Sequence, residues 1–129
     1  MDNLLKGFLR SDHAGEVGAV YIYKGILKVA KDAELVSFSK RHLATEESHL
    51  QKIEAVLPKK DRSKLVWLWK VAGFLLGFLP ALFGPKIVFA TIEAVETFVE
   101  EHFVSRARGR FERGSSCWTW QSVRSLKVL

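Results

Sequence analysis

The sequence has little cysteine, little proline and no long uninterrupted apolar run. Cys117 is the only cysteine among 129 residues, so an internal disulfide framework is excluded and a reducing interior is expected. The longest stretch without a charged residue, 71–85, contains Pro80 and is shorter than the roughly 20 apolar residues of a spanning helix. The N-terminus has neither an apolar signal segment nor an Arg/Ser-rich transit segment. We therefore expect the mature chain to begin near Met1 and to stay in a cytoplasm.

The positive charge is concentrated at the C-terminal end. Residues 1–103 carry 14 Lys/Arg against 13 Asp/Glu, whereas residues 104–129 carry six basic residues against Glu112. The first segment is therefore nearly neutral, and without a recognisable nucleic-acid motif no nucleic-acid partner is expected. The second segment lacks an apolar stripe of helical spacing. We predict a helical domain over residues 1–103 and a basic, divergent, poorly ordered tail over residues 104–129.

Apolar residues recur at steps of three and four, which predicts an all-α fold. We expect one helix from a cap at Asp12 to about residue 31, a turn at Asp32, and a second helix over residues 33–57. A basic connection follows. A strongly apolar helix is predicted over 65–79, then a break at Pro80, then a third long helix from Pro85 to about residue 102.

Three of these helices place a carboxylate inside an apolar stripe. The carboxylates are Glu16, Glu46 and Glu96, and His49 follows Glu46 by three residues. A charge on a core-facing stripe is costly unless something neutralises it, and a metal ion does so. If the first two helices form an antiparallel pair turning at Asp32, Glu16 and Glu46 lie about 24 and 21 Å from the turn, at nearly the same height.

Each of these residues also has an ordinary interpretation. A lone stripe glutamate often extends to water, and the Glu-x-x-His spacing arises by chance on helices. The joint pattern is what favours a metal site, with Fe, Mn and Zn all compatible with the ligands. Ferritin-like bundles use one Glu from each of two helices and a Glu-x-x-His pair from each of two others.

Four stretches of the sequence carry a resemblance to a known family: residues 12–25 (DHAGEVGAVYIYKG), residues 44–50 (ATEESHL), residues 68–77 with 81–84, and residues 94–103 (AVETFVEEHF). Together they resemble the demethoxyubiquinone hydroxylase family, a group of ferritin-like di-iron monooxygenases of ubiquinone biosynthesis. The first stretch is similar to its opening helix, the second to its first Glu-x-x-His helix, the third to its membrane-facing segment and the fourth to its third metal helix.

The resemblance implies two irons, with Glu16 as a ligand of one, Glu46 bridging, His49 as its partner ligand and Glu96 on the second. No catalytic residue beyond the metal ligands is implied. It also implies O₂-dependent hydroxylation of a polyprenyl benzoquinol ring, and a peripheral position on the inner face of a bacterial-type cell membrane. The apolar segment would face the bilayer and admit the isoprenoid tail. Judged alone, that segment would be a buried helix.

The sequence departs from the family pattern after Glu96. A second Glu-x-x-His is absent from residues 97–129, leaving four of six family ligands and one or no bound iron as possibilities. His102, about 240° around the helix from Glu96, points away from that stripe. Without a fourth metal helix, apolar stripes are exposed, so we expect a homodimer, aggregation, or a partner protein of ubiquinone biosynthesis.

Two other functions stay open at this point. The first is a non-catalytic, membrane-associated fragment of the same fold that binds quinone or a partner, which the missing Glu-x-x-His favours. The second is a ferritin-like metal-storage or metal-sensing protein, which the long apolar segment disfavours.

Overall fold

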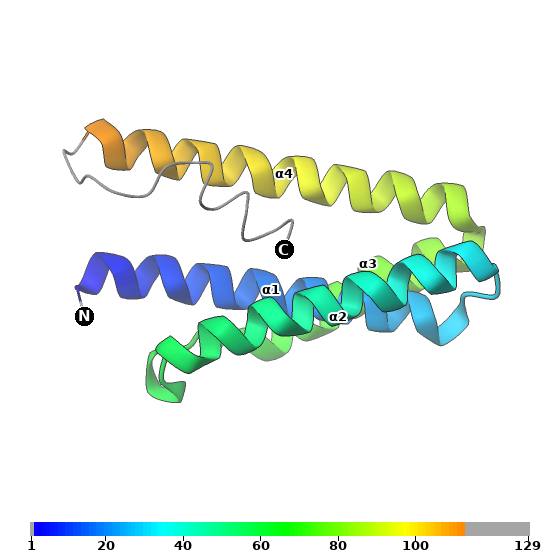
Figure 1. The fold of residues 1–129 in the computed structure, drawn as a ribbon, viewed down its shortest axis with the longest axis horizontal. Coiled ribbons are helices and arrows are strands. Elements are labelled where there is room, and N and C mark those ends of the chain that lie inside the picture. Colours follow the sequence, from blue (N-terminus) through cyan, green and yellow to red (C-terminus); the bar gives the residue numbers. More distant parts are fainter. Residues whose placement is uncertain (1, 113–129) are drawn as a thin grey trace. The chain divides into compact units, whose positions relative to one another are not determined.

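The computed structural model describes residues 2–112, which fall into two compact units that divide after Val88. Within residues 2–112 every regular element is a helix, which confirms the all-α fold of a ferritin-like bundle. The elements are α1 (Asn3–Val29), α2 (Ala33–Val56), the short 3-10 helix η1 (Lys59–Asp61), α3 (Val66–Phe83) and α4 (Pro85–Glu112) (Figure 1).

Helices α1 and α2 form the expected antiparallel pair. The chain reverses between them at residues 30–32, and Asp32 caps α2 by accepting the backbone N–H of Leu35 at 2.9 Å. The predicted start of the first helix was wrong, because α1 begins at Asn3 with Asp2 as its cap. Residues 3–11 contain several strong helix formers, and extending an existing helix costs little, so α1 runs straight through Asp12.

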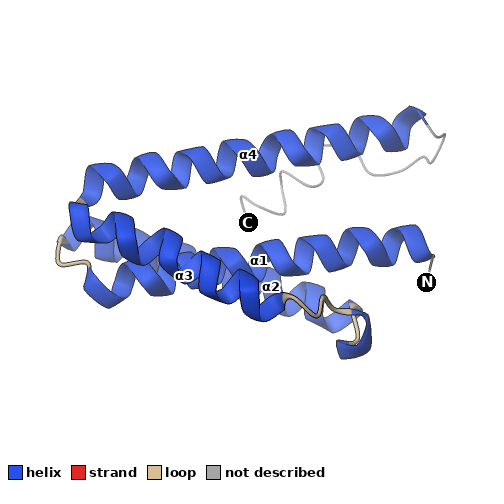
Figure 2. Ribbon diagram, turned by 180° about the vertical axis from the view of Figure 1, so that it is seen from behind, coloured by secondary structure: helices blue, strands red, loops and turns tan. Residues whose placement is uncertain are grey.

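Helix α1 is the centre of the first unit because it contacts both α2 and α3 (Figure 2). Its two buried sides carry Val17, Val20, Tyr23 and Ile26, among others. The α2 helix adds Leu35, which is 2 % exposed. The α1–α2 contact follows the apolar stripes that the sequence indicated, whereas the α1–α3 contact depends on glycine.

Helix α3 crosses α1 at very short range through two of its glycines. A Cβ atom at Gly77 would overlap the backbone carbonyl of Ile22, and one at Gly73 would overlap the carbonyl of Gly18. Any larger residue would push the two backbones apart. The contact is therefore made by backbone rather than by interdigitated side chains, and it leaves the large side chains of α3 on its outer face.

The predicted break at Pro80 was also wrong, because α3 continues through Pro80 to Phe83. Proline removes one helical hydrogen bond, but the turn that precedes it is held on α1 by Gly77. The chain turns instead at Gly84, whose φ of 112° is one that other residues rarely adopt. Pro85 then begins α4, as expected.

Helix α4 extends beyond its predicted end near residue 102 and stops at Glu112. Within residues 103–112 Phe103, Ala107 and Phe111 recur at steps of four, and Arg, Ala and Glu are good helix formers, which favours the longer helix. The structure does not describe the side chain of His102, so its predicted orientation away from Glu96 stays a prediction. Cys117 and the remaining tail, residues 113–129, lie outside the described residues, so the predicted disorder of the tail stays a prediction.

Candidate metal site

Three of the four predicted ligands meet on the α1–α2 pair. His49 Nδ1 lies 3.4 Å from Glu46 Oε2 and 3.9 Å from Glu16 Oε2. One ligand atom from each residue lies within 4.8 Å of the other two. The three side chains are between 9 and 19 % exposed, so the cluster is largely shielded from solvent without being closed.

The hairpin geometry explains why these side chains converge. Glu16 and Glu46 lie at similar distances from the turn at Asp32, and antiparallel packing brings positions of equal height together. Glu46 and His49 share one face of α2 because positions i and i+3 are one turn apart. The height match predicted from the sequence is therefore what the structure shows.

The cluster fits a divalent cation. Two carboxylates lie beside one imidazole in a partly buried place, and negative charge there is costly without a counter-ion. His49 Nε2 is buried and has no hydrogen-bond partner within the described part of the chain. Carboxylate oxygen and imidazole nitrogen suit Fe and Mn as well as Zn. The three residues supply one Glu from one helix and one Glu-x-x-His from another, half of the set found in di-iron bundles.

The fourth predicted ligand, Glu96, belongs to the second unit. It lies on α4 and its side chain is exposed. Its assignment to a second iron stays a prediction. Glu93 and Glu100 are exposed as expected.

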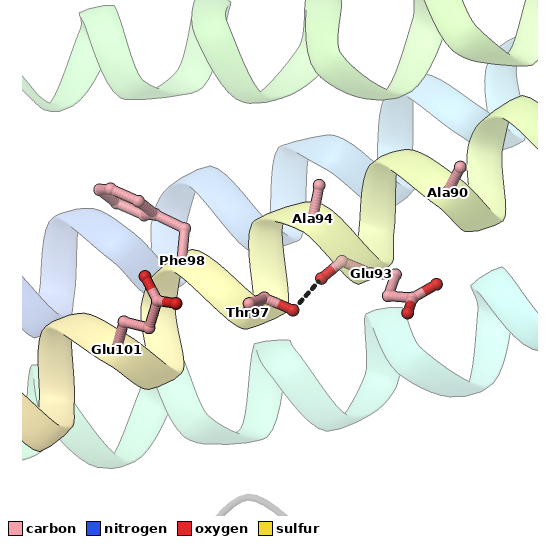
Figure 3. A pocket seen from close by; sticks show the side chains of 6 residues that line it. All are labelled: Ala90, Glu93, Ala94, Thr97, Phe98 and Glu101. Carbon is pink, nitrogen blue, oxygen red and sulfur yellow. Dashed lines mark hydrogen bonds between the residues drawn. The ribbon is translucent and has the colours of Figure 1, made fainter.

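A hollow on α4 is lined by exposed residues of that helix alone (Figure 3). There the Thr97 hydroxyl donates to the backbone carbonyl of Glu93 at 2.9 Å. Thr97 is the one neutral polar side chain that lines the hollow, and its donor is therefore already engaged. The hollow therefore offers two glutamates but no histidine, and it does not resemble the cluster on α1 and α2.

Further polar residues lie on the contact between α1 and α2, here called the α1–α2 seam, and were not predicted from the sequence. His13 lies three residues before Glu16 and is 2 % exposed, and its Nε2 lies 3.1 Å from Glu54 Oε1. On α2, Ser39 is fully buried, and His42 stacks on Phe38 with ring centroids 4.0 Å apart. Counting back from Glu16 and Glu46 in steps of three or four would have found His13, His42 and Ser39.

The outer face of α3 is strongly apolar and exposed. Trp67, Leu79 and Phe83 are 62, 49 and 78 % exposed, and the 18-residue helix has a mean hydropathy of 1.7 with only 11 % of its residues buried. Among the described helices it alone has the length and composition to cross a membrane. The expectation of a plain buried helix, drawn from the segment alone, does not describe α3.

An all-helical bundle with two carboxylates and a histidine gathered on neighbouring helices defines a class of helical protein that could hold a metal ion between its helices. Comparison of the sequence with protein families narrows that class. The family described as ubiquinone biosynthesis protein COQ7 matches residues 3–115. This chain belongs to that family.

Curated relatives agree with the family match. A 3-demethoxyubiquinol 3-hydroxylase of Rhodospirillum rubrum is 41 % identical over 103 residues, covering 78 % of this chain and 49 % of the relative. A mitochondrial NADPH-dependent 3-demethoxyubiquinone 3-hydroxylase of Dictyostelium discoideum is 33 % identical over 107 residues, covering 81 % and 49 %. A mitochondrial 5-demethoxyubiquinone hydroxylase of Saccharomyces cerevisiae is 35 % identical over 104 residues, covering 78 % and 45 %. The chain spans about half the length of these relatives.

Proposed function

We propose that this chain binds iron at Glu16, Glu46 and His49 and serves the O₂-dependent hydroxylation of a demethoxyubiquinol ring in ubiquinone biosynthesis. The observation that carries the proposal is the convergence of these three side chains in a member of the COQ7 family. These three relatives are named as hydroxylases of demethoxyubiquinone or demethoxyubiquinol, which supports the substrate class.

The reaction inserts one oxygen atom of O₂ into a ring C–H bond, giving C–OH, and reduces the other atom to water. It consumes two electrons and two protons, and a reduced nicotinamide is a donor of the right class. Bound iron supplies the redox chemistry with O₂. The residues of the chain hold the metal: Glu16 and Glu46 neutralise its charge, and His49 contributes a neutral nitrogen ligand. Glu96 is proposed as the ligand of a second iron.

The exposed apolar face of α3 supports a lipid-borne substrate. A benzoquinol with an isoprenoid tail is carried in a bilayer, and a helix with Trp67 and Trp69 at one end and Leu and Phe along its length suits the surface of that bilayer. We propose that the protein lies peripherally on the inner face of a bacterial-type cell membrane, and that α3 makes the contact.

Iron content tests the metal site directly. We expect one or two irons per chain after anaerobic loading of the wild type, and a loss of at least one in Glu46→Gln. Glu47→Gln is the matched control because Glu47 is the exposed neighbour of Glu46 on the same helix. Equal iron in both variants would refute the site, and no iron in the wild type would refute the proposal as a whole.

A second candidate function is a non-catalytic, membrane-associated module that binds quinone or a partner protein. The exposed face of α3 favours it independently of any metal. Under this function the iron-loaded chain would convert no demethoxyubiquinol, yet would still sediment with vesicles. Hydroxylated product from iron-loaded protein supplied with a reductant and O₂ would exclude it.

Vesicle sedimentation tests the membrane contact. The pair of substitutions Leu75→Glu and Leu79→Glu places two charges on the exposed face of α3, where the side chains are 45 and 49 % exposed. We expect binding to phosphatidylcholine vesicles to fall at least tenfold, because each charge must be desolvated on insertion. Val56→Glu is the control: Val56 is 53 % exposed but lies on α2. Equal loss in the control would remove the special role of α3.

A further inference from the structure

The polar seam between α1 and α2 does not stop at the metal cluster. One turn from Glu16 on the same face of α1 lies His13, whose side chain is only 3 % exposed. Its Nε2 lies 3.1 Å from Oε1 of Glu54, which is near the C-terminal end of α2. Its Nδ1 is buried and has no hydrogen-bond partner within residues 2–101. A buried ring nitrogen without a partner is costly and needs a physical explanation.

Glu54 connects this buried histidine to solvent. Its side chain is 37 % exposed, and the same Oε1 atom that faces His13 lies 3.8 Å from Arg62 Nη1. Arg62 is itself anchored, because its Nε donates to the carbonyl of Leu57 and its Nη2 to the carbonyl of Glu54. The carboxylate is thus held in place with one edge toward water and one oxygen on the imidazole.

We propose that Glu54 and His13 form a proton relay from solvent to the metal cluster. This rests on the proposed function, since hydroxylation with O₂ consumes two protons inside a site that the helices shield from bulk water. Imidazole suits the task because its two ring nitrogens accept and release protons near neutral pH. Here Nε2 faces the exposed carboxylate and Nδ1 is buried, on a residue one helical turn from Glu16.

The transfer balances at every atom. Glu54 takes a proton from water and gives it to His13 Nε2, while His13 releases the proton on Nδ1 toward the cluster. Glu54 returns to a carboxylate, and the ring is reset when it rotates about the Cβ–Cγ bond, which carries the proton on Nε2 inward and turns the bare nitrogen toward Glu54. A water molecule between Nδ1 and the Glu16 carboxylate would complete the path and would give the buried nitrogen its missing partner.

A purely structural role is the competing explanation, in which His13 and Glu54 simply clamp α1 to α2. Exchange of the ring N–H with solvent separates the two without any metal or activity. In metal-free protein labelled with ¹⁵N-histidine, the His13 signal is assigned by its loss in His13→Gln. We expect Glu54→Gln to slow exchange at this ring about tenfold, because the amide cannot cycle a proton. An unchanged exchange rate overturns the relay.

The matched control is Asp61→Asn. Asp61 pairs with Lys6 at 3.8 Å and so joins α1 to η1, close to the point where the His13–Glu54 pair joins α1 to α2. We expect this variant to leave both ring exchange and turnover unchanged. Slowed exchange in Asp61→Asn would show that loosening this end of the seam suffices, and would overturn the relay.

Turnover of the iron-loaded protein gives the second measurement. We expect His13→Gln to bind iron as the wild type does and to hydroxylate about 100-fold more slowly, the usual size of a lost acid–base group. We expect His13→Ala to recover part of the rate with added imidazole, which a clamp would not show. Full activity in His13→Gln overturns the relay. A wild type that takes up iron but does not hydroxylate refutes the function, and the exchange measurement still decides whether the proton path exists.

Discussion

The two sides of α1 are built in opposite ways. Toward α2 the contact consists of side chains, and several are polar. His13 faces Glu54, Glu16 faces His49, and Tyr23 faces His42. Toward α3 the contact consists of backbone, with Gly73 and Gly77 against the carbonyls of Gly18 and Ile22. The first side carries polar and ionisable side chains, whereas the contact on the second is made by glycines. Helix α3 therefore supports the hairpin through its backbone, and the hairpin holds the candidate metal ligands.

The largest expected effect is stabilisation by metal, and it belongs to the α1–α2 side alone. An ion that binds only the folded chain, supplied at about 100 times its Kd, adds about 2.7 kcal/mol to the free energy of unfolding. For a chain of this size that raises the Tm by about 10 °C. Thermal unfolding with and without Fe²⁺ or Co²⁺ measures it.

His49→Gln should abolish most of this shift because it removes the only nitrogen ligand of the cluster. His42→Gln is the control, since His42 lies two turns away on the same helix and stacks on Phe38 instead. An equal loss of the metal-induced shift in both variants would show that the ion does not bind at the cluster.

The next effect separates the backbone contact from ordinary helix surface. Gly77→Ala is expected to destabilise by about 1–3 kcal/mol, because its methyl group would overlap the Ile22 carbonyl and the helices must separate. Gly15→Ala is expected to stabilise by up to about 1 kcal/mol, since nothing lies within 4 Å of a Cβ there and alanine favours helix. Urea unfolding measures both, and the same sign for the two would contradict the close crossing of α3 on α1.

The side of α1 toward α2 was the more predictable from sequence. Stripe periodicity and the turn at Asp32 gave the heights of Glu16 and Glu46, and so their meeting. The side toward α3 was not predictable, because a stripe analysis records large apolar residues and the contact is made by residues that have no side chain. Pro80 was interpreted as a break for a similar reason: its local cost is visible in the sequence, but the anchoring of the preceding turn is not.

His13 shows a different limit. Its position on the seam follows from the spacing to Glu16, yet its significance depends on Glu54, 41 residues away, and on burial of its Nδ1. Periodicity assigns a residue to a face of a helix but does not identify the residue across from it. The same holds for Glu96, because its position on an apolar stripe does not identify which other ligands it would join.

The smallest effect concerns the turn that sets the register of the α1–α2 side. Asp32→Ala removes the acceptor of the Leu35 N–H and should cost about 1 kcal/mol. Asp2 accepts the Leu4 N–H at 3.2 Å at the exposed start of α1. Asp2→Ala should lower the free energy of unfolding by only a few tenths of about 1 kcal/mol, because helix ends fray.

The informative measurement is metal affinity in these two cap variants rather than stability alone. A looser turn lets Glu16 and Glu46 slide out of equal height, so Asp32→Ala should raise the Kd for Co²⁺ several-fold, whereas Asp2→Ala should leave it unchanged. The glycine crossing lies on the other side of α1 and does not depend on this turn. If Asp32→Ala weakens metal binding no more than Asp2→Ala does, the cap is not needed to hold α1 and α2 in register. The packing of α3 on α1 would then also determine the geometry of the metal ligands.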